Sequence, residues 1–448
     1  MKKVLFLLVS LSLLFFSCSK LQDPVSPESD DEIQSLEKSN LNYTNHYIVE
    51  YGDADISAAV NGVGGTVDRV FPELGLAQVS GLDSKSVKAL RKKSGVKEVT
   101  QDILVQWVKP DQDAFNEHIG EDEGFWFLQW SMRAISAPAA WDAGFTGEGV
   151  RVAVIDGGMS AGHIDLDDNI DFTASKSFVD GYEWWQDDDT GPEGPFRHAT
   201  HVAGIIAAED NEIGTIGVAP GAEIIALKAL HDGSGSFADI IAAIYYAAGE
   251  AQADVINMSL GAFFPRNSRG AAKLINAMGH AMNYANQQGV IVVVSAGNDG
   301  IDFDHAAMYV HVPSEVQHVI NVSATAPTGF FLGGTDFDTP ASYTNYGQSF
   351  VDFAAPGGDF DYPEFPTYLY DMIIAPGAGT SDYYFSAGTS MASPHVAGVV
   401  ALILQKNGGL NPAQVESILK KSSNDLGKPG NDDYFGQGRV NAYNAVMY

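Results

Sequence analysis

Cysteine is almost absent from this sequence. The one cysteine among 448 residues is Cys18, so the chain cannot form an internal disulfide bond. Basic residues are also scarce, because 25 lysines and arginines stand against 57 aspartates and glutamates, which gives a formal charge of −32. A chain this acidic is very soluble and is repelled by the phosphates of nucleic acid. We therefore expect no nucleic-acid partner.

The apolar run at the start of the chain is short. It extends from Val4 to Phe16 after Met1-Lys2-Lys3, too short to span a bilayer comfortably, and this layout is typical of an export signal. Ser17 then precedes Cys18, an arrangement that resembles a bacterial lipoprotein signal, in which the cysteine becomes lipidated and N-terminal. We predict a signal peptide with a lipobox over residues 1–18 and an exported protein, secreted or held as a cell-envelope lipoprotein. A plain secretory signal cut near Ser17 is the alternative.

Two segments follow the signal. Residues 19–44 carry prolines and acidic residues without an apolar period, which predicts a flexible linker. Residues 45–108 alternate between strand-like and helix-like patterns in the order β-α-β-β-α-β, the ferredoxin-like unit. The expected elements are Tyr47–Tyr51, Ile56–Val63, Thr66–Phe71, Leu76–Val79, Ser84–Lys93 and Val96–Asp102, the last closed by Val105–Trp107.

The remainder of the chain predicts a larger α/β domain. Residues 109–124 are polar, acidic and accessible in character, which is typical of a segment that a protease cuts. Within residues 125–448, apolar runs alternate with helical patterns, so we expect a central, mostly parallel sheet covered on both faces. Ligands bind such sheets beyond the carboxyl ends of the strands. The expected strands are Val150–Ile155, Glu223–Leu230, Val255–Ser259 and Val290–Ser295, and the expected helices are Thr200–Ala208, Phe237–Gln252, Gly270–Gln288 and Pro412–Ser422.

Three polar residues stand beside these elements. Asp156 follows the first core strand, where it could equally be a helix cap or a cation ligand. His198 opens a helix of small residues with His201 three positions on; the two could grip a metal, but no Glu or third His accompanies them in a zinc-like spacing. Asn298 ends another core strand, where a turn asparagine is the simpler interpretation.

Ser390 begins the fourth candidate segment. Gly388 is expected to form a tight turn that delivers this serine to the start of a helix, and the apolar run from Val399 to Leu404 predicts that the helix is buried. Pro394 is expected within the first turn, where a missing N–H costs little. The N–H groups and dipole of such an N-terminus favour negative charge. Alone, the segment is equally consistent with an ordinary Ser/Thr cap.

Taken together, three motifs resemble the subtilisin-like serine proteases, the peptidase S8 family. They are Asp156-Gly157-Gly158, the run from His198 to Gly204 and the run from Gly388 to Gly398, in the order Asp, His, Ser that subtilisin has. The resemblance covers roughly residues 129 to 446. Two positions depart from the family's pattern, Ala199 where glycine is usual and Gly157 where Thr or Ser is commoner. The fold that the resemblance implies is the subtilisin-like three-layer sandwich.

The resemblance also implies the roles of the site residues. Ser390 is the nucleophile, His198 the general base and Asp156 the residue that fixes the tautomer of His198 and stabilises its imidazolium. Asn298 and the Ser390 N–H hold the oxyanion. His201 and His395 are packed residues without a catalytic part.

Substrate contacts follow from the same likeness. Ser259, Leu260 and Gly261 resemble the edge segment that pairs with an extended peptide by strand addition. Ala296 and Gly297 resemble one wall of the pocket for the residue before the scissile bond. The floor of that pocket is expected near residues 310–313, from which the side chain of His311 can protrude, so no side-chain preference is assigned.

A metal site is implied as well. Residues 209–217 resemble the family's calcium-binding loop, with Asp165 as a distant carboxylate, and hard oxygen ligands suit Ca²⁺. We expect structural calcium and no organic cofactor; an acidic loop without metal is the alternative. The expected ligands are Asp165, Glu209, Asn211, Ile213 and Thr215.

Residues 45–108 resemble the family's inhibitor-type propeptide, which assists folding and blocks the cleft. These likenesses predict an exported serine endopeptidase made as a self-processing zymogen. Its partners are polypeptide substrates and its own propeptide, and we expect a monomer. A lipid on Cys18 would lie upstream of the propeptide, so cleavage within residues 109–124 would also release the catalytic domain. The alternatives are a catalytically silent peptide-binding protein on the same scaffold and a metal-dependent hydrolase that uses Asp156, His198 and His201.

Overall fold

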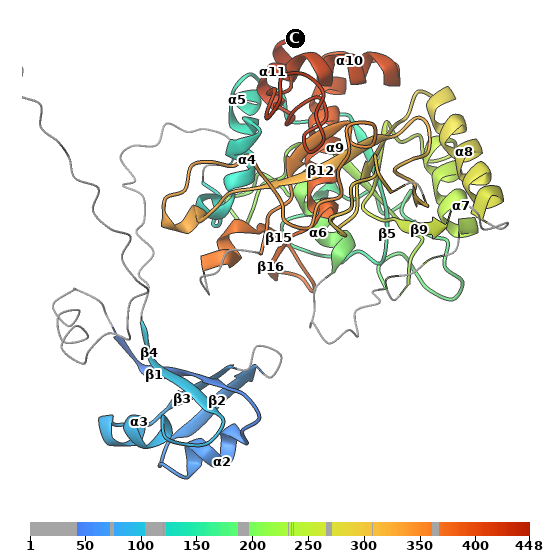
Figure 1. Cartoon of the computed structure of the whole chain (residues 1–448). Helices are drawn as coiled ribbons and strands as arrows, with labels where there is room; N and C mark the ends of the chain where they lie inside the picture. The colour runs from blue at the N-terminus through green and yellow to red at the C-terminus, as the bar shows by residue number, and fades with distance from the viewer. Residues whose placement is uncertain are drawn as a thin grey trace, which may run out of the picture. The chain divides into compact units, whose positions relative to one another are not determined.

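A computed structural model of the chain has two compact units, Met1–Ala114 and Phe115–Tyr448 (Figure 1). The division falls inside the segment predicted as a cleavable linker. The predicted signal peptide, the linker 19–44 apart from its last two residues, and the strand Val105–Trp107 lie outside the described residues. None of the helices in the described part is long and apolar enough to cross a bilayer. The structure describes residues 43–71, 76–103, 120, 122–186, 197–231, 233, 235, 237–265, 271–306, 308–360 and 367–448.

The first unit has the predicted β-α-β-β-α-β order. Its sheet is antiparallel with the strand order β2-β3-β1-β4. Asp55 and Asp83 cap the two helices, since their carboxylates accept hydrogen bonds from Ala58 N (3.0 Å) and Ser86 N (2.7 Å). The helices bury Val60 and other apolar residues against one face of the sheet. The elements are β1 (Tyr43–Tyr51), α2 (Ile56–Asn61), β2 (Thr66–Phe71), β3 (Leu76–Ser80), α3 (Ser84–Leu90) and β4 (Val96–Ile103).

The second unit is built on a mostly parallel sheet. Among the described residues it has eight strands in the order β13-β12-β10-β8-β5-β7-β6, with β14 paired to β12. All of its pairs are parallel except β12 with β13. The strands are β5 (Arg151–Asp156), β6 (Lys176–Ser177), β7 (Glu223–Lys228), β8 (Val255–Met258), β10 (Ile291–Ser295), β12 (Ile320–Ala326), β13 (Thr339–Pro340) and β14 (Phe353–Pro356).

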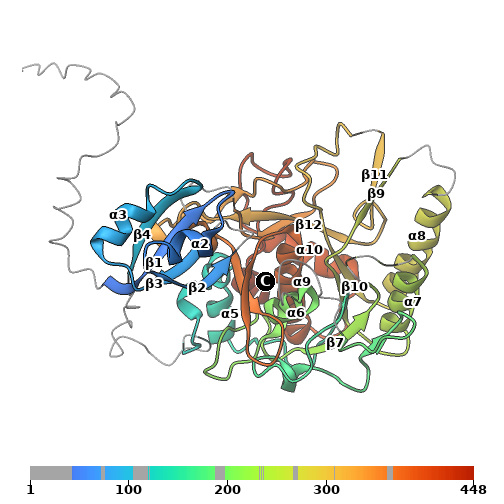
Figure 2. The same ribbon diagram turned by 90° about the horizontal axis from the view of Figure 1, so that it is seen from below.

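Helices cover both faces of this sheet, as predicted. Val152 and Val154 of β5 join the apolar cluster under α6 and α9, whereas Ala153 and Ile155 join the cluster under α7 and α8. Figures 1 and 2 show α7 and α8 lying together along one side of the unit. The second unit therefore has the three-layer α/β architecture. The helices are α4 (Trp130–Ala134), α5 (Ala137–Asp142), α6 (His198–Ala207), α7 (Phe237–Ala248), α8 (Ala271–Gln287), α9 (Thr389–Lys406), α10 (Pro412–Ser422) and α11 (Ala442–Met447).

Helix α9 differs from its prediction in one detail. It is buried along most of its length, as expected, but Pro394 lies inside the helix rather than in its first turn, because α9 begins at Thr389. The predicted turn is present: Gly388 precedes the helix in an extended conformation (φ 166°, ψ 159°), and its carbonyl oxygen accepts a hydrogen bond from Met391 N at 2.9 Å. Two antiparallel pairs lie outside the main sheet, β9 (Ala262–Pro265) with β11 (Tyr309–Val312) and β15 (Ile373–Pro376) with β16 (Tyr383–Ser386).

Candidate active site

Neighbouring parallel strands carry three of the predicted residues to one edge of the sheet. Asp156 is the last residue of β5, Ser259 follows β8, and Asn298 comes three residues after β10. The order β10-β8-β5 makes these strands adjacent. His198 is the first residue of α6 and Ser390 the second of α9, and these two helices pack against each other. The carboxyl ends of the strands and the N-termini of the helices thus supply the predicted site.

The predicted base and its partner are in contact. Nδ1 of His198 lies 2.9 Å and 2.8 Å from the two carboxylate oxygens of Asp156, which is 3% exposed as a side chain. Carboxylate oxygens accept, so Nδ1 donates, and in the neutral ring Nε2 is the basic nitrogen. Burial lowers the pKa of His198, but the charge and hydrogen bond of Asp156 outweigh it, so the pKa lies above its ordinary value of 6.5.

Asn298 is oriented by the residue before the nucleophile. Its Oδ1 accepts hydrogen bonds from the backbone N and the Oγ1 of Thr389, both at 2.8 Å. A Cβ built on Gly388 would lie 3.4 Å from Asn298 Nδ2 and 3.6 Å from Ser390 N, so both donors border the same small space. These are the two groups predicted to hold an oxyanion. Glycine at 388 keeps that space open.

The proline inside α9 explains the contact that Ser259 makes. Pro394 has no N–H, so it cannot donate to the carbonyl of Ser390 four residues earlier. Ser259 Oγ donates to that carbonyl instead (2.8 Å), and Ser393 Oγ lies 2.9 Å from the same hydroxyl. Ser390 Oγ in turn donates to Ser259 O at 3.3 Å. Ser259 therefore anchors the first turn of α9. Direct contact between the side chains of Ser390 and His198 stays a prediction.

The other predicted substrate residues differ in burial: Leu260 and Gly261 are at least partly exposed, whereas Ala296 is buried. Leu260 and Gly261 lie between β8 and β9 and belong to no strand in the described part, which suits a segment that pairs with a peptide. Gly297 lies beside the nucleophile, because its N donates to Thr389 Oγ1 at 3.0 Å. Ala296 is fully buried, and its side chain packs in an apolar cluster. Its side chain therefore lies behind the predicted pocket wall and does not line it.

The remaining two histidines of these helices are packing residues in the structure. Nε2 of His201 lies 3.2 Å from Ile373 O and 2.9 Å from Tyr384 O, and burial lowers the pKa of His201 to about 3. Carbonyl oxygens only accept, so Nε2 carries the proton and cannot serve as a metal ligand beside Asp156. Burial likewise lowers the pKa of His395 to about 4. This geometry argues against the metal-dependent hydrolase.

The predicted calcium ligands lie around one loop. Asp165 is fully buried, and its Oδ2 accepts from Thr215 N and Thr215 Oγ1, both at 3.0 Å. Asn211 Nδ2 lies 3.2 Å from Glu209 Oε2, and Asn211 Oδ1 accepts from Ile213 N at 3.0 Å. The side chains of Asn211 and Thr215 are thus engaged within the loop. Burial raises the pKa of Asp165 to about 8, and the charge of Glu123 adds to this.

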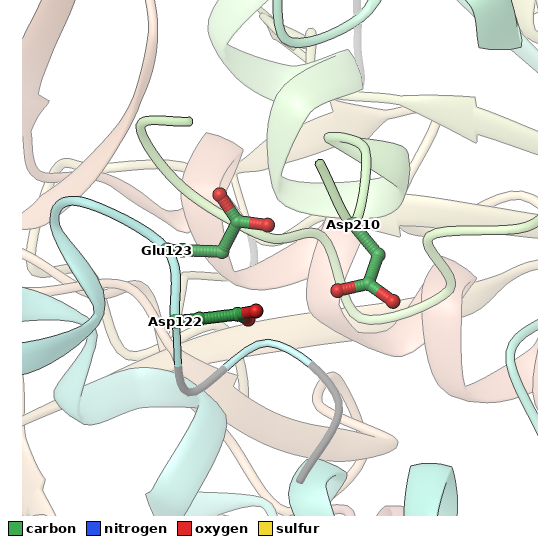
Figure 3. A group of neighbouring side chains, drawn as sticks. All are labelled: Asp122, Glu123 and Asp210. Carbon is green, nitrogen blue, oxygen red and sulfur yellow. The ribbon is translucent and has the colours of Figure 1, made fainter. Parts of the chain in front are cut away.

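Glu123 is a member of this site that the sequence patterns do not reveal. Its Oε1 accepts from Asn211 N (2.7 Å) and Glu212 N (3.0 Å), and burial raises its pKa to about 7. In the described part of the chain, Asp122, Glu123 and Asp210 bring carboxylate oxygens within 4.8 Å of one another (Figure 3). Glu123 is 4% exposed, so the expectation of an accessible segment up to residue 124 is wrong at this position.

Two buried carboxylate oxygens at this loop lack a hydrogen-bond partner among the described residues. They are Asp165 Oδ1 and Glu123 Oε2. The charges of Asp165 and Glu123 also act on Tyr383, whose pKa burial raises. Unpaired buried acids are costly unless protonated or bound to a cation. The oxygen-rich donor set therefore fits a hard divalent cation such as Ca²⁺.

The comparisons with known proteins agree with this architecture. Residues 147–438 match the subtilase family, peptidase S8. The chain is 31% identical to the thermophilic serine proteinase of Bacillus sp. (strain AK1) over 433 aligned residues. The alignment covers 94% of this chain and 92% of that protein. It is 36% identical over 316 residues to subtilisin Savinase of Lederbergia lenta, over 70% of this chain and 97% of that one.

A solved structure gives the same result. The epidermin leader peptide processing serine protease of Staphylococcus aureus is similar with a TM-score of 0.61 and 25% identity, over 91% of this chain and 98% of that one. The matched family covers most of the second unit, and the similarity to the thermophilic proteinase extends along nearly the whole chain. The chain therefore belongs to the subtilase family, whose members are serine proteases.

Proposed function

We propose that this chain is an exported serine endopeptidase that hydrolyses peptide bonds through an acyl-enzyme on Ser390. The observation that carries the proposal is the contact of His198 Nδ1 with both oxygens of buried Asp156. That contact directs the basic Nε2 away from the carboxylate, on a helix packed against the one that bears Ser390. A silent peptide-binding protein has no need of this arrangement.

The chemistry divides among four residues. Ser390 Oγ attacks the carbonyl carbon while its proton passes to Nε2 of His198. The oxyanion that forms accepts hydrogen bonds from Asn298 Nδ2 and Ser390 N, whose shared space Gly388 leaves open. The C–N bond then breaks and His198 returns the proton to the leaving amine. Water, activated by the same imidazole, hydrolyses the acyl-enzyme and frees Ser390.

The first unit is assigned the part of an intramolecular inhibitor and folding aid. Its β-α-β-β-α-β fold and the similarity to the thermophilic proteinase over 94% of the chain support this assignment. Gly120 and Glu123 are buried residues of the second unit, which supports a cut upstream of Gly120, within about residues 109–119. With a lipid on Cys18, such a cut would free the catalytic unit from the membrane.

Labelling with a fluorophosphonate probe tests the proposal. Wild type is expected to take up one probe at Ser390, identified by mass spectrometry of the labelled peptide, with and without a chelator. Ser390→Ala should not be labelled, whereas Ser381→Ala, a change at an exposed serine, should be labelled like wild type. Unlabelled wild type that still binds peptides would identify a silent binding protein. Turnover lost on metal removal, with labelling unchanged, would favour metal chemistry.

Calcium is proposed as a structural ion held by Asp165, Glu123 and the loop of residues 209–217. When bound, it supplies positive charge that keeps the buried carboxylates ionised. Adding calcium at about 100 times its dissociation constant is expected to stabilise the folded state by about 2.7 kcal/mol, seen as a rise in Tm by calorimetry. Asp165→Asn should abolish this rise, and Asp180→Asn, at an exposed aspartate, should keep it. An equal rise in wild type and Asp165→Asn would contradict the assignment.

A further inference from the structure

Two glycines flank the nucleophile on segments that follow adjacent strands. Gly261 lies two residues after Ser259, whose carbonyl oxygen is 3.3 Å from Ser390 Oγ. Gly297 donates its N–H to Thr389 Oγ1 at 3.0 Å and directly precedes Asn298. Both segments are predicted substrate contacts, so in the proposed reaction the residue whose carbonyl carbon meets Ser390 places its side chain beside them. The space between the glycines therefore decides which side chains the site accepts.

The imidazole of His311 occupies that space. A Cβ built on Gly261 would lie 2.4 Å from Cε1 and 2.6 Å from Nε2 of His311. A Cβ built on Gly297 would lie 3.0 Å from the same Nε2 and 3.4 Å from the same Cε1. Both glycines thus contact one edge of one ring. Side chains larger than hydrogen are excluded at both positions, and the ring closes the gap between them.

The ring is held in place from behind. His311 is 3% exposed, and its Nδ1 lies 2.8 Å from Ser314 Oγ. Ser314 donates its only hydroxyl proton to Ser295 O at 2.9 Å, so Nδ1 of His311 is the donor to Ser314. The rings of Phe303 and Phe350 pack edge-on, with centroids 6.0 Å and 6.2 Å from the imidazole. A swing of the ring out of the gap would break these contacts.

The same ring offers no positive charge near neutral pH. Burial lowers the pKa of His311 to about 4, and the nearby Asp299 only partly opposes this. An acidic substrate side chain would therefore gain no ion pair there and would meet a chain of net charge −32. The arrangement therefore selects substrate side chains by their size and not by their charge.

We propose that His311 restricts the residue before the scissile bond to glycine, alanine or serine, and excludes large aliphatic and aromatic side chains. The inference rests on the proposed function and deepens it by naming the substrate class. Position 311 acts as the floor of a shallow pocket whose walls are Gly261 and Gly297. A smaller residue at 311 would open depth for a larger side chain.

A series of chromogenic peptides that differ only in the residue before the scissile anilide tests the inference. Wild type is expected to cleave the alanine peptide about 10- to 100-fold faster, in kcat/KM, than the phenylalanine or leucine peptides, the range that one pocket misfit produces. His311→Gly is expected to raise kcat/KM for phenylalanine about tenfold or more, with alanine changed little. His305→Gly, at a side chain 84% exposed, should keep the wild-type profile.

The outcomes separate this inference from the proposed function. Equal cleavage of the alanine and phenylalanine peptides by wild type would overturn the pocket assignment, and this measurement needs no variant. The assignment would also be overturned if the His311→Gly enzyme reacted with the fluorophosphonate probe but showed no higher kcat/KM for the phenylalanine peptide than wild type. Wild type that cleaves no peptide and takes up no probe would refute the protease itself, and the substrate class with it.

Discussion

The Ser390→Ala chain is expected to remain at full precursor length, whereas wild type trims itself upstream of Gly120. Removal of the nucleophile leaves Asp156, His198 and Asn298 in place but removes the atom that attacks the carbonyl carbon. In subtilisin, a member of this family, the same change was measured to cost about 10⁶-fold in kcat. A gel and an intact-mass measurement on protein made by cell-free synthesis, where no host protease is present, would show which form accumulates.

The control for this prediction is Ser381→Ala, which changes an exposed serine and should mature like wild type. Adding a trace of mature wild type to the Ser390→Ala precursor then distinguishes cleavage within one chain from cleavage between chains. If the purified Ser390→Ala precursor trims itself at the wild-type position and rate, Ser390 is not the nucleophile of processing.

Much of the site could be predicted because parallel strands bring distant segments to one edge. Asp156 and Asn298 each follow an apolar strand, so their place at the carboxyl edge of the sheet is a consequence of the strand pattern. The order of elements in the first unit could also be predicted, because its apolar residues follow strand-like and helix-like patterns in turn. Helix ends were predicted less accurately: α7 ends at Ala248, four residues before the predicted end at Gln252.

Contacts between segments far apart in the sequence could not be predicted. Glu123 lies in an acidic stretch typical of exposed linkers, and only its hydrogen bond to Asn211 N, 88 residues away, shows that it is a buried part of the loop. The contact of Ser259 could not be predicted either. Its hydroxyl donates to the carbonyl oxygen of Ser390, which lacks its usual helical donor because Pro394 has no N–H. No local pattern in either segment carries this information. Side-chain packing between elements decides it.

The Asp156→Asn enzyme is expected to lose about 10⁴-fold in kcat while keeping its fold. The carboxylate accepts the proton on Nδ1 of His198 and so leaves Nε2 basic, whereas an amide can present its NH₂ to Nδ1 and favour the wrong tautomer. Losses of about this size were measured for the equivalent aspartates of subtilisin and of another serine protease. Single-turnover kinetics with an activated ester would measure the loss directly.

The pH profile supplies a second readout of the same substitution. In wild type the charge of Asp156 holds the pKa of His198 above 6.5, so activity should fall as the pH drops through that raised value and the base becomes protonated. Without that charge, burial is the largest remaining influence and lowers the pKa of His198. The acidic limb should therefore move to lower pH in Asp156→Asn. Asp254→Asn is the matched control, because Asp254 accepts a hydrogen bond from Arg151 N at the opposite end of β5. Equal losses in the two variants, or an acidic limb unchanged in Asp156→Asn, would mean that Asp156 supports the sheet and not the imidazole.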